Sequence, residues 1–401
     1  MKTIRLSVLA CLILSATFLP SAFGNHRTGM LALPEVLAAG DFNGDGNLDL
    51  AVDVTGFDVA AIFIGDGKGG FTLKGHVTLD TLPKGLAVGD MNEDAHPDLV
   101  SCTAWGYTMQ LLLGDGSGGF NPANHLKGDG EPTRLVLRDF NKDSHLDIAV
   151  NAPDEGKIIL YFGDGKGSFA IPSTEIEGYP RPFGLAAGDF NSDGNLDIVT
   201  TTRTGRTATA SHIAVLLGNG AGTFSQSAQF SVNQMPTSIQ VGDLNKDGIL
   251  DLVVGGAESG NTEGNFISTF LGDGKGHFAL KQTTTLDPGN LKGDIAIGDF
   301  NEDEILDVAF PVTGIESTQK IKSRTVLIFF GDGTGNLVAG PSLTVGQEPH
   351  SVITADFNKD GHLDLAVTNR TDGTMSILLG DGKGNFTLST TLSVISPALN
   401  P

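Results

Sequence analysis

The sequence predicts an all-β fold, a seven-bladed β-propeller made of four-stranded antiparallel blades. Three observations lead to this prediction: an Asp-rich motif that occurs seven times, a Gly-rich motif that follows each copy, and a repeat length of about 50 residues. Repeats of this length with several short strands are typical of propellers, whereas parallel solenoids have shorter periods.

The Asp motif has the pattern Asp-x-Asn-x-Asp-x-x-x-Asp and begins at Asp41, Asp90, Asp139, Asp189, Asp243, Asp299 and Asp356. The Gly motif, Gly-Asp-Gly-x-Gly-x-Phe, begins at Gly65, Gly114, Gly163, Gly218, Gly272, Gly331 and Gly380, with Asn219 and Leu337 as its main departures. From an Asp motif to its Gly motif the distance is 24 residues in four repeats, but 29, 29 and 32 in repeats 4, 5 and 6. The extra length therefore lies in one loop of three neighbouring repeats.

Each repeat divides into four expected strands, A to D. Strand A is an apolar stretch such as residues 85–88, and strand B follows the Asp motif, as in residues 363–367. Strand C is exemplified by residues 376–379 and strand D by residues 386–388. The Asp-Gly pair of the Gly motif supplies the positive backbone angles that a tight C–D hairpin needs. A Pro stands seven residues before the Asp motif in every repeat except the sixth, which has Lys292: Pro34, Pro83, Pro132, Pro182, Pro236 and Pro349.

Residues 1–24 have the pattern of a secretory signal peptide. Lys2 and Arg5 precede an apolar run over residues 6–19, and small residues stand at Ala22 and Gly24. We therefore expect a mature chain of residues 25–401, one propeller domain, which is secreted, periplasmic or at the cell surface. The alternative is a lipoprotein signal that ends at Cys11. A mature chain that begins at Asn25 has one cysteine, Cys102, which excludes an internal disulfide.

The composition excludes several classes of protein. The chain has 55 Gly in 401 residues, 39% hydrophobic residues and a formal net charge of -22. The only long apolar run is the signal segment, so no membrane span is expected. The strong negative charge and the absence of a basic tract argue against a nucleic-acid partner. We expect a monomer.

The Asp motif has the chemistry of a calcium loop. Ca²⁺ takes six to eight oxygen ligands, and side chains at positions 1, 3 and 5 of a tight loop converge on one point. In the first repeat these are Asp41, Asn43 and Asp45, with the carbonyl of Asn47 and the carboxylate of Asp49 completing the set. The loop is not an EF-hand, because position 12 holds no Glu in any copy. The alternative is an Asx-rich turn without metal, in which the aspartates would repel one another.

The motifs, the repeat length and the signal segment resemble the FG-GAP/VCBS repeat family, whose relatives include the propeller of integrin alpha chains. The resemblance covers residues 34–394. It implies that the loop between strands A and B of each blade binds calcium, with up to seven ions. The implied ligands, which include the backbone carbonyl of position 7, are Asp41, Asn43, Asp45, Asn47 and Asp49; Asp90, Asn92, Asp94, His96 and Asp98; Asp139, Asn141, Asp143, His145 and Asp147; Asp189, Asn191, Asp193, Asn195 and Asp197; Asp243, Asn245, Asp247, Ile249 and Asp251; Asp299, Asn301, Asp303, Ile305 and Asp307; and Asp356, Asn358, Asp360, His362 and Asp364.

Position 6 of the loop distinguishes the seven copies. Gly46, Gly194, Gly248 and Gly361 would ease a strained backbone there. Ala95, Ser144 and Glu304 would not. Loops 1, 4, 5 and 7 are therefore expected to bind calcium better than loops 2, 3 and 6.

Three classes of function are compatible with such a propeller. A binding or adhesion module for a glycan or protein surface is favoured, since no HExxH motif, nucleophile elbow or non-repeating acid/base pair indicates an enzyme. The alternatives are a polysaccharide lyase or hydrolase and a purely structural scaffold. A ligand would bind the face formed by the B–C and D–A loops, beside the insertions of blades 4 to 6, and the bases there favour anionic groups. Candidate ligand-binding residues are Trp105, Tyr107, Tyr179, Arg181, Arg203, Arg206, Lys320, Lys322 and Arg324.

Overall fold

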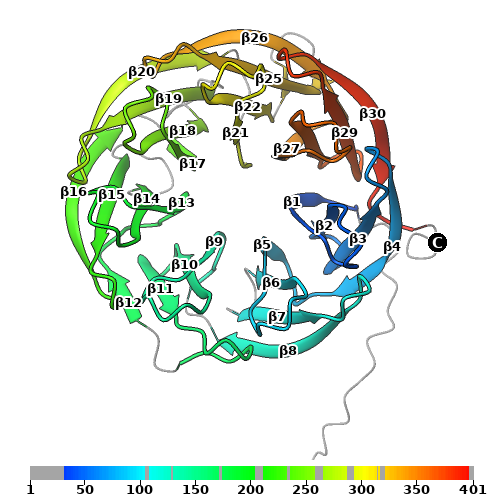
Figure 1. Cartoon of the computed structure of the whole chain (residues 1–401), viewed down its shortest axis with the longest axis horizontal. Coiled ribbons are helices and arrows are strands. Elements are labelled where there is room, and N and C mark those ends of the chain that lie inside the picture. Colours follow the sequence, from blue (N-terminus) through cyan, green and yellow to red (C-terminus); the bar gives the residue numbers. More distant parts are fainter. Residues whose placement is uncertain are drawn as a thin grey trace, which may run out of the picture.

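The computed structural model describes residues 31–103, 108–127, 130–170, 174–203, 211–232, 235–257, 265–286, 293–313, 315–316 and 321–396. Seven four-stranded antiparallel sheets form a closed ring around a central axis (Figure 1). The predicted seven-bladed propeller is confirmed. The expected signal peptide, residues 1–24, lies outside the described residues.

Each blade is one continuous segment of chain. Blades 1 to 3 contain β1 (Pro34–Gly40), β2 (Asp49–Val54), β3 (Val59–Gly65) and β4 (Phe71–Thr78); β5 (Pro83–Gly89), β6 (Asp98–Thr103), β7 (Thr108–Gly114) and β8 (Phe120–Lys127); and β9 (Leu135–Arg138), β10 (Asp147–Ala152), β11 (Lys157–Tyr161) and β12 (Thr174–Glu177). Blades 4 and 5 contain β13 (Leu185–Gly188), β14 (Asp197–Arg203), β15 (Ser211–Gly218) and β16 (Phe224–Val232); and β17 (Met235–Gly242), β18 (Asp251–Ala257), β19 (Asn265–Gly272) and β20 (Phe278–Leu286).

Blade 6 contains β21 (Ala296–Gly298), β22 (Asp307–Val312), β25 (Thr325–Gly331) and β26 (Leu337–Thr344), and blade 7 contains β27 (Pro349–Ala355), β28 (Asp364–Asn369), β29 (Thr374–Gly380) and β30 (Phe386–Ser393). A small hairpin of β23 (Ile315–Glu316) and β24 (Ile321–Lys322) lies within the longest insertion. The three insertions all separate the second strand of a blade from the third, as the spacing predicts. Among the described residues no helix is long and apolar enough to span a membrane.

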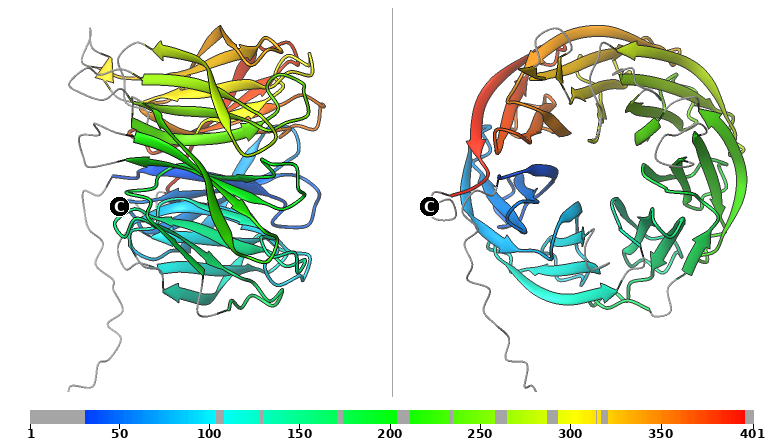
Figure 2. Two further views of the ribbon diagram at one scale, coloured as in Figure 1. Left: turned by 90° about the vertical axis from the view of Figure 1, so that its left-hand side faces the viewer. Right: turned by 180° about the vertical axis from the view of Figure 1, so that it is seen from behind.

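The position of a strand in its blade determines how much of it is buried. The first strand of each blade lines the axis and the fourth lies on the outer rim (Figure 2). The second strand is buried along its whole length in β2, β6 and β10, because each sheet packs against a sheet on either side. The fourth strand alternates between partly buried and exposed residues, as β30 shows. This alternation is typical of a strand with one face in solvent.

Five of the seven joints between neighbouring blades contain the same aromatic contact, and the other two have Met91 and Leu244 in place of the first Phe. The Phe at position 2 of one Asp motif packs edge-to-face on the Phe after the Gly motif of the next blade, with Phe42 and Phe120 centroids 5.2 Å apart. The carbonyl of Phe42 also accepts a hydrogen bond from Gly118 in the turn of the next blade (2.7 Å). Blade 7 contacts blade 1 in the same way, through Phe357 and Phe71 (5.6 Å). The ring is therefore closed by the same packing that joins consecutive blades.

Candidate functional site

The seven Asp loops lie between the first and second strands of their blades, beside the Gly-motif turns. In loop 1, Asp49 at position 9 accepts hydrogen bonds from the amides of Phe42 and Gly65, both at 2.8 Å. The equivalent pair of bonds occurs in the other six loops at 2.8 to 2.9 Å. The position-9 carboxylate thus fastens the Asp loop to the C–D turn of its own blade.

The position-9 side chains are fully buried, which changes their acidity. Burial raises the pKa of Asp98, Asp147, Asp197 and Asp307 to about 6, although their two amide hydrogen bonds act in the opposite direction. The nearby aspartates of the same loop raise the pKa further. An opposite charge close to these carboxylates would offset both effects.

The remaining loop side chains bond to loop amides. Asp41 accepts bonds from the amides of Asp45 (3.1 Å) and Gly46 (2.8 Å), and Asn43 Oδ1 accepts from Asp45 (2.9 Å). Asp45 Oδ1 accepts from the amide of Asn47 (2.8 Å). The same bonds occur in the other six loops. This is the hydrogen-bonding pattern of successive Asx turns.

The donor set of each loop is suited to calcium. It consists of oxygen atoms only, with three carboxylates and one amide oxygen per loop, which is the chemistry that Ca²⁺ prefers. In the described part of the chain, however, no three His, Cys, Asp or Glu side chains are grouped so that they could hold a metal ion. Calcium binding by the 35 implied positions therefore stays a prediction.

Two histidines of the Asp loops connect neighbouring blades. His145 Nδ1 lies 2.5 Å from Glu93 Oε1 of the preceding blade, and His362 Nδ1 lies 2.5 Å from Glu302 Oε1. The bond to the glutamate raises the pKa of both histidines. The sequence-based prediction gives these histidines a role only through their backbone carbonyls. The signal it missed is that each follows a loop with Glu at position 4.

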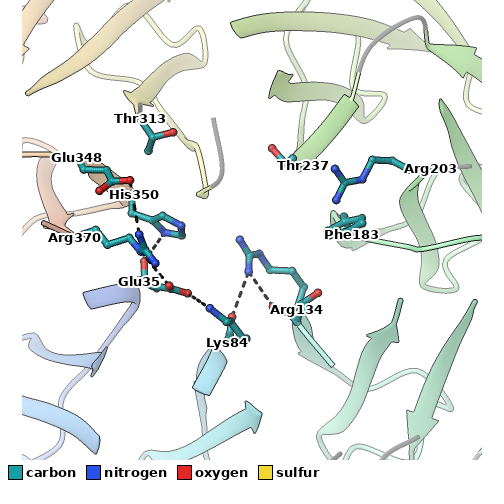
Figure 3. A pocket seen from close by; sticks show the side chains of 11 residues that line it. Glu35, Lys84, Arg134, Phe183, Arg203, Thr237, Thr313, Glu348, His350 and Arg370 are labelled. Carbon is teal, nitrogen blue, oxygen red and sulfur yellow. Dashed lines mark hydrogen bonds and ion pairs between the residues drawn. The ribbon is translucent and has the colours of Figure 1, made fainter. Parts of the chain in front are cut away.

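At the opposite end of the ring, a cavity of about 390 Å³ opens on the axis. We call it the axial pocket; Figure 3 shows its lining, to which all seven blades contribute. Six of the lining residues directly follow the repeat's Pro, near the start of the first strand. The lining consists of Glu35, Lys84, Thr133, Arg134, Phe183, Arg203, Thr237, Thr313, Glu348, His350 and Arg370.

One side of the axial pocket is a network of ion pairs. Glu35 Oε2 lies 2.6 Å from Lys84 Nζ, and Glu35 Oε1 lies 3.1 Å from Arg370 Nε. Arg370 also approaches Glu348 (3.7 Å). Burial alone would raise the pKa of Glu35, but the positive charge of Lys84 and the other basic neighbours brings it below its ordinary value. Burial lowers the pKa of His350, so its ring is neutral at pH 7.

A further ion pair separates the pocket from the central channel. Arg134 Nε of blade 3 bonds to Asp294 Oδ1 of blade 6 at 2.9 Å, so the pair spans the axis between non-adjacent blades. Arg134 also donates to the carbonyls of Thr133 (2.9 Å) and Lys84 (3.3 Å). The channel on the far side is lined by first-strand residues such as Val36, Val136 and Val352.

Arg203 differs from the other bases of the pocket. Its guanidinium lies 3.4 Å from the centroid of the Phe183 ring, and its buried Nε has no hydrogen-bond partner among the described residues. Burial, together with the charge of Arg181, lowers the pKa of Arg203 to about 10. The buried Oγ1 of Thr313, on another side of the pocket, also has no partner among the described residues.

The structure places the predicted ligand-binding residues at different locations. Arg203 lines the axial pocket, whereas Tyr179 is buried between blades and donates to Gln226 Oε1 (3.3 Å). Arg181 lies 3.7 Å from Asp154, and Arg324 lies 3.8 Å from Asp372. Lys322 belongs to β24, and its side chain is not among those described. Outside the described residues lie Trp105, Tyr107, Arg206 and Lys320.

Comparison with known proteins establishes the family. The FG-GAP-like repeat family matches the chain at residues 41–101, 90–150, 139–200 and 205–254, together a little over half of its length. The chain belongs to this family, which confirms the resemblance drawn from the motifs. A comparison with curated proteins gave no match.

Solved structures share the fold at low sequence identity. Hydrazine synthase of Kuenenia stuttgartiensis has 12% identity and a TM-score of 0.63, covering 90% of this chain and 99% of that chain. A putative 6-phosphogluconolactonase from Bacteroides fragilis has 16% identity and a TM-score of 0.62, covering 90% and 95%. BBS1N in complex with ARL6DN has 12% identity and a TM-score of 0.61, covering 92% and 97%. At such identities the likeness shows the propeller fold alone.

Proposed function

We propose that this chain is a secreted, calcium-stabilised propeller that binds a glycan or protein surface through the face opposite the Asp loops. A propeller of this family is compatible with a binding or scaffold module in general. The axial pocket is the observation that supports the narrower proposal of ligand binding through the face opposite the Asp loops. At the Asp-loop end the repeats are nearly identical, whereas at the axial pocket equivalent positions hold residues as different as Glu35, Lys84 and Phe183. Such differences give a symmetric ring one asymmetric place for a ligand.

The binding proposal is tested with the purified mature chain in calcium buffer. We expect selective binding on an array that carries neutral glycans, acidic glycans and extracellular proteins. Depolymerisation of a bound polysaccharide would replace the proposal by a lyase or hydrolase. Absence of any ligand would favour a scaffold. Mass spectrometry of the protein exported from its full-length gene tests secretion, with Asn25 as the expected first residue.

The calcium proposal is supported by the donor chemistry of the loops. Three carboxylates within nine residues repel one another, and a divalent cation would neutralise most of that charge. A site that binds only the folded chain adds about 2.7 kcal/mol when free calcium is a hundredfold above the dissociation constant. We therefore expect excess chelator to lower the melting temperature strongly. A melting curve that is the same in chelator and in calcium would refute calcium binding.

A further inference from the structure

We propose that the axial pocket binds the carboxylate of a small hydroxylated acid about the size of one hexuronate, with Arg203 as the residue that binds the anion. The proposal deepens the function proposed above and rests on it. It moves the expected site from the insertions of blades 4 to 6 to the axis of the ring.

The charges of the pocket indicate that its ligand carries a single negative group. Among the described residues, Lys84 and Arg370 share Glu35, Arg370 also approaches Glu348, and Arg134 pairs with Asp294. Within the described part of the chain, none of the ion pairs joins an acid to Arg203. Among the described residues, four bases and two acids line the pocket and Asp294 lies just beyond it, which leaves one positive charge in excess, at Arg203.

The environment of Arg203 makes an anion favourable there. Its guanidinium is held in place by stacking on Phe183 and has lost part of its hydration, which is costly for an uncompensated charge. Its Nε donor is buried without a partner in the described part of the chain. A carboxylate that accepts from the planar guanidinium would satisfy both the charge and the donor, because two parallel N–H groups match the two oxygens. Figure 3 shows the guanidinium directed into the pocket.

The size of the pocket and the unsatisfied hydroxyl of Thr313 limit the class of ligand that the pocket can bind. A cavity of about 390 Å³ is at the lower end of the roughly 300–1,000 Å³ of small-molecule sites. The Thr313 hydroxyl, buried without a partner among the described residues, can bond to a ligand hydroxyl. The neutral ring of His350 adds no charge to this side of the pocket. A carboxylate next to hydroxyl groups, as in a uronic acid, meets these requirements.

The test is titration calorimetry on the full mature chain in calcium buffer with three probes. Glucuronate offers the carboxylate and the hydroxyls, acetate the carboxylate alone, and glucose the hydroxyls alone. We expect glucuronate to bind at least tenfold more tightly than acetate, and glucose to give no measurable binding. Glucose 6-sulfate and a short peptide with a free carboxyl terminus are expected to bind more weakly than glucuronate.

Variants assign the contacts. Arg203→Gln should raise the Kd for glucuronate at least tenfold. Thr313→Val should raise it for glucuronate but leave acetate unchanged, which a general loss of structure would not do. If the Gln variant proves unstable, Arg203→Lys takes its place in the test. It keeps the positive charge but not the planar guanidinium, so it should also weaken the binding of glucuronate. Arg324→Gln removes a base of the same face outside the pocket, near Asp372, and should bind glucuronate as the parent chain does.

Several results would overturn the inference. These are equal binding of glucose and glucuronate, tighter binding of the sulfate or the peptide, no binding of glucuronate at millimolar concentration, and unchanged binding by Arg203→Gln. In each case a ligand found on the arrays would leave the broader binding proposal intact, so the two proposals can fail separately.

Discussion

Two positions of every Asp loop hold the backbone at positive φ, and most of them are not glycine. At position 6, φ lies between 65° and 91° in all seven loops, including those with Ala95, Ser144 and Glu304. Position 4 has the same conformation and is Gly only in loop 1, at Gly44. The sequence-based ranking of the seven loops rests on position 6 alone. Because non-Gly residues are strained in this conformation, loops 2, 3 and 6 carry two such residues each.

A Gly-to-Ala change at position 6 isolates this backbone effect. A Cβ on Gly194 would meet nothing within 4 Å, so Gly194→Ala loses only backbone freedom at φ of +79°. We expect a loss of about 1 kcal/mol in the free energy of unfolding, and Ser144→Gly should give a gain of similar size. Urea denaturation in chelator measures both without a contribution from calcium. Two variants that change stability in the same direction would contradict the strain argument.

Asp53 is a buried carboxylate with one unsatisfied oxygen. Its Oδ1 accepts from the amides of Glu35 (3.0 Å) and Val36 (2.6 Å), while its Oδ2 has no partner among the described residues. Burial, with the negative charge of Glu35 as the next cause, raises its pKa to about 7. In blade 3 the same place is taken by Asn151, whose Oδ1 accepts from the amides of Thr133 and Arg134. A neutral amide can therefore perform the structural role of Asp53.

Asp53→Asn should make stability less dependent on pH. Between pH about 4 and 7, folded Asp53 keeps a proton that the unfolded chain releases, so its contribution to stability falls as pH rises, by up to about 1.4 kcal/mol per pH unit. The variant has no such group. The stability of the variant relative to the parent chain should thus increase by a few kcal/mol from pH 4.5 to 7.5, as measured by denaturation in chelator. A constant difference across this range would show that Asp53 titrates normally.

At the scale of the element, the Asp loop and the Gly turn act as one unit because the position-9 aspartate joins them. In loop 3, Asp147 accepts from the amides of Phe140 (2.8 Å) and Gly163 (2.9 Å). Asp143 at position 5 is exposed, and its Oδ1 accepts from the amide of His145 (2.9 Å). Both are implied calcium ligands, but only Asp147 is needed for the loop-to-turn connection.

Asn substitutions at Asp147 and Asp143 separate calcium binding from the connection between the Asp loop and the Gly turn. Asp147→Asn places an NH₂ group against one of two backbone donors, so we expect a loss of about 1–3 kcal/mol even in excess chelator. Asp143→Asn keeps an acceptor for the His145 amide and should matter little in chelator. It should, however, reduce the stabilisation that calcium gives, which thermal unfolding in both buffers measures. Equal losses for both variants in chelator would argue against the structural role of Asp147.

The sequence predicted the elements well because each depends on contacts within one repeat. The strand order, the tight Gly turn at Gly67 and Gly69, and the position of the insertions all follow from local spacing. The axial pocket depends instead on residues that only the closed ring brings together. Arg134 and Asp294 are 160 positions apart. The available signal was the position after the repeat's Pro, where the residues cease to repeat.

At the scale of the whole molecule, ring closure differs from the other joints in one respect. Each four-stranded sheet is formed by one segment of chain, so among the described residues no strand is exchanged between blade 7 and blade 1. The joint relies on Phe71 packed against Phe357, the Gly69 amide bonded to the Phe357 carbonyl (3.3 Å), and the Glu35–Arg370 ion pair. His76 Nε2 also lies 3.0 Å from the Val394 carbonyl near the end of the last strand. Unlike the six other joints, this one has no covalent connection that keeps the blades together when the packing loosens.

Removal of the closing aromatic should therefore open the ring locally. Phe357→Ala empties a fully buried position and should lower the free energy of unfolding by about 3–5 kcal/mol. Phe140→Ala is the matched control, because Phe140 makes the same contact with Phe224 (6.0 Å) between the covalently linked blades 3 and 4. In hydrogen exchange under native conditions, Phe357→Ala should lose protection first in β1–β4 and β27–β30, since separated blades 7 and 1 expose those sheets while the other five remain packed. Phe140→Ala should lower protection without opening that joint, because the chain holds blades 3 and 4 close enough to repack at once. Uniform loss of protection around the ring in both variants would show that the propeller unfolds as one cooperative unit and that closure is no weaker than any other joint.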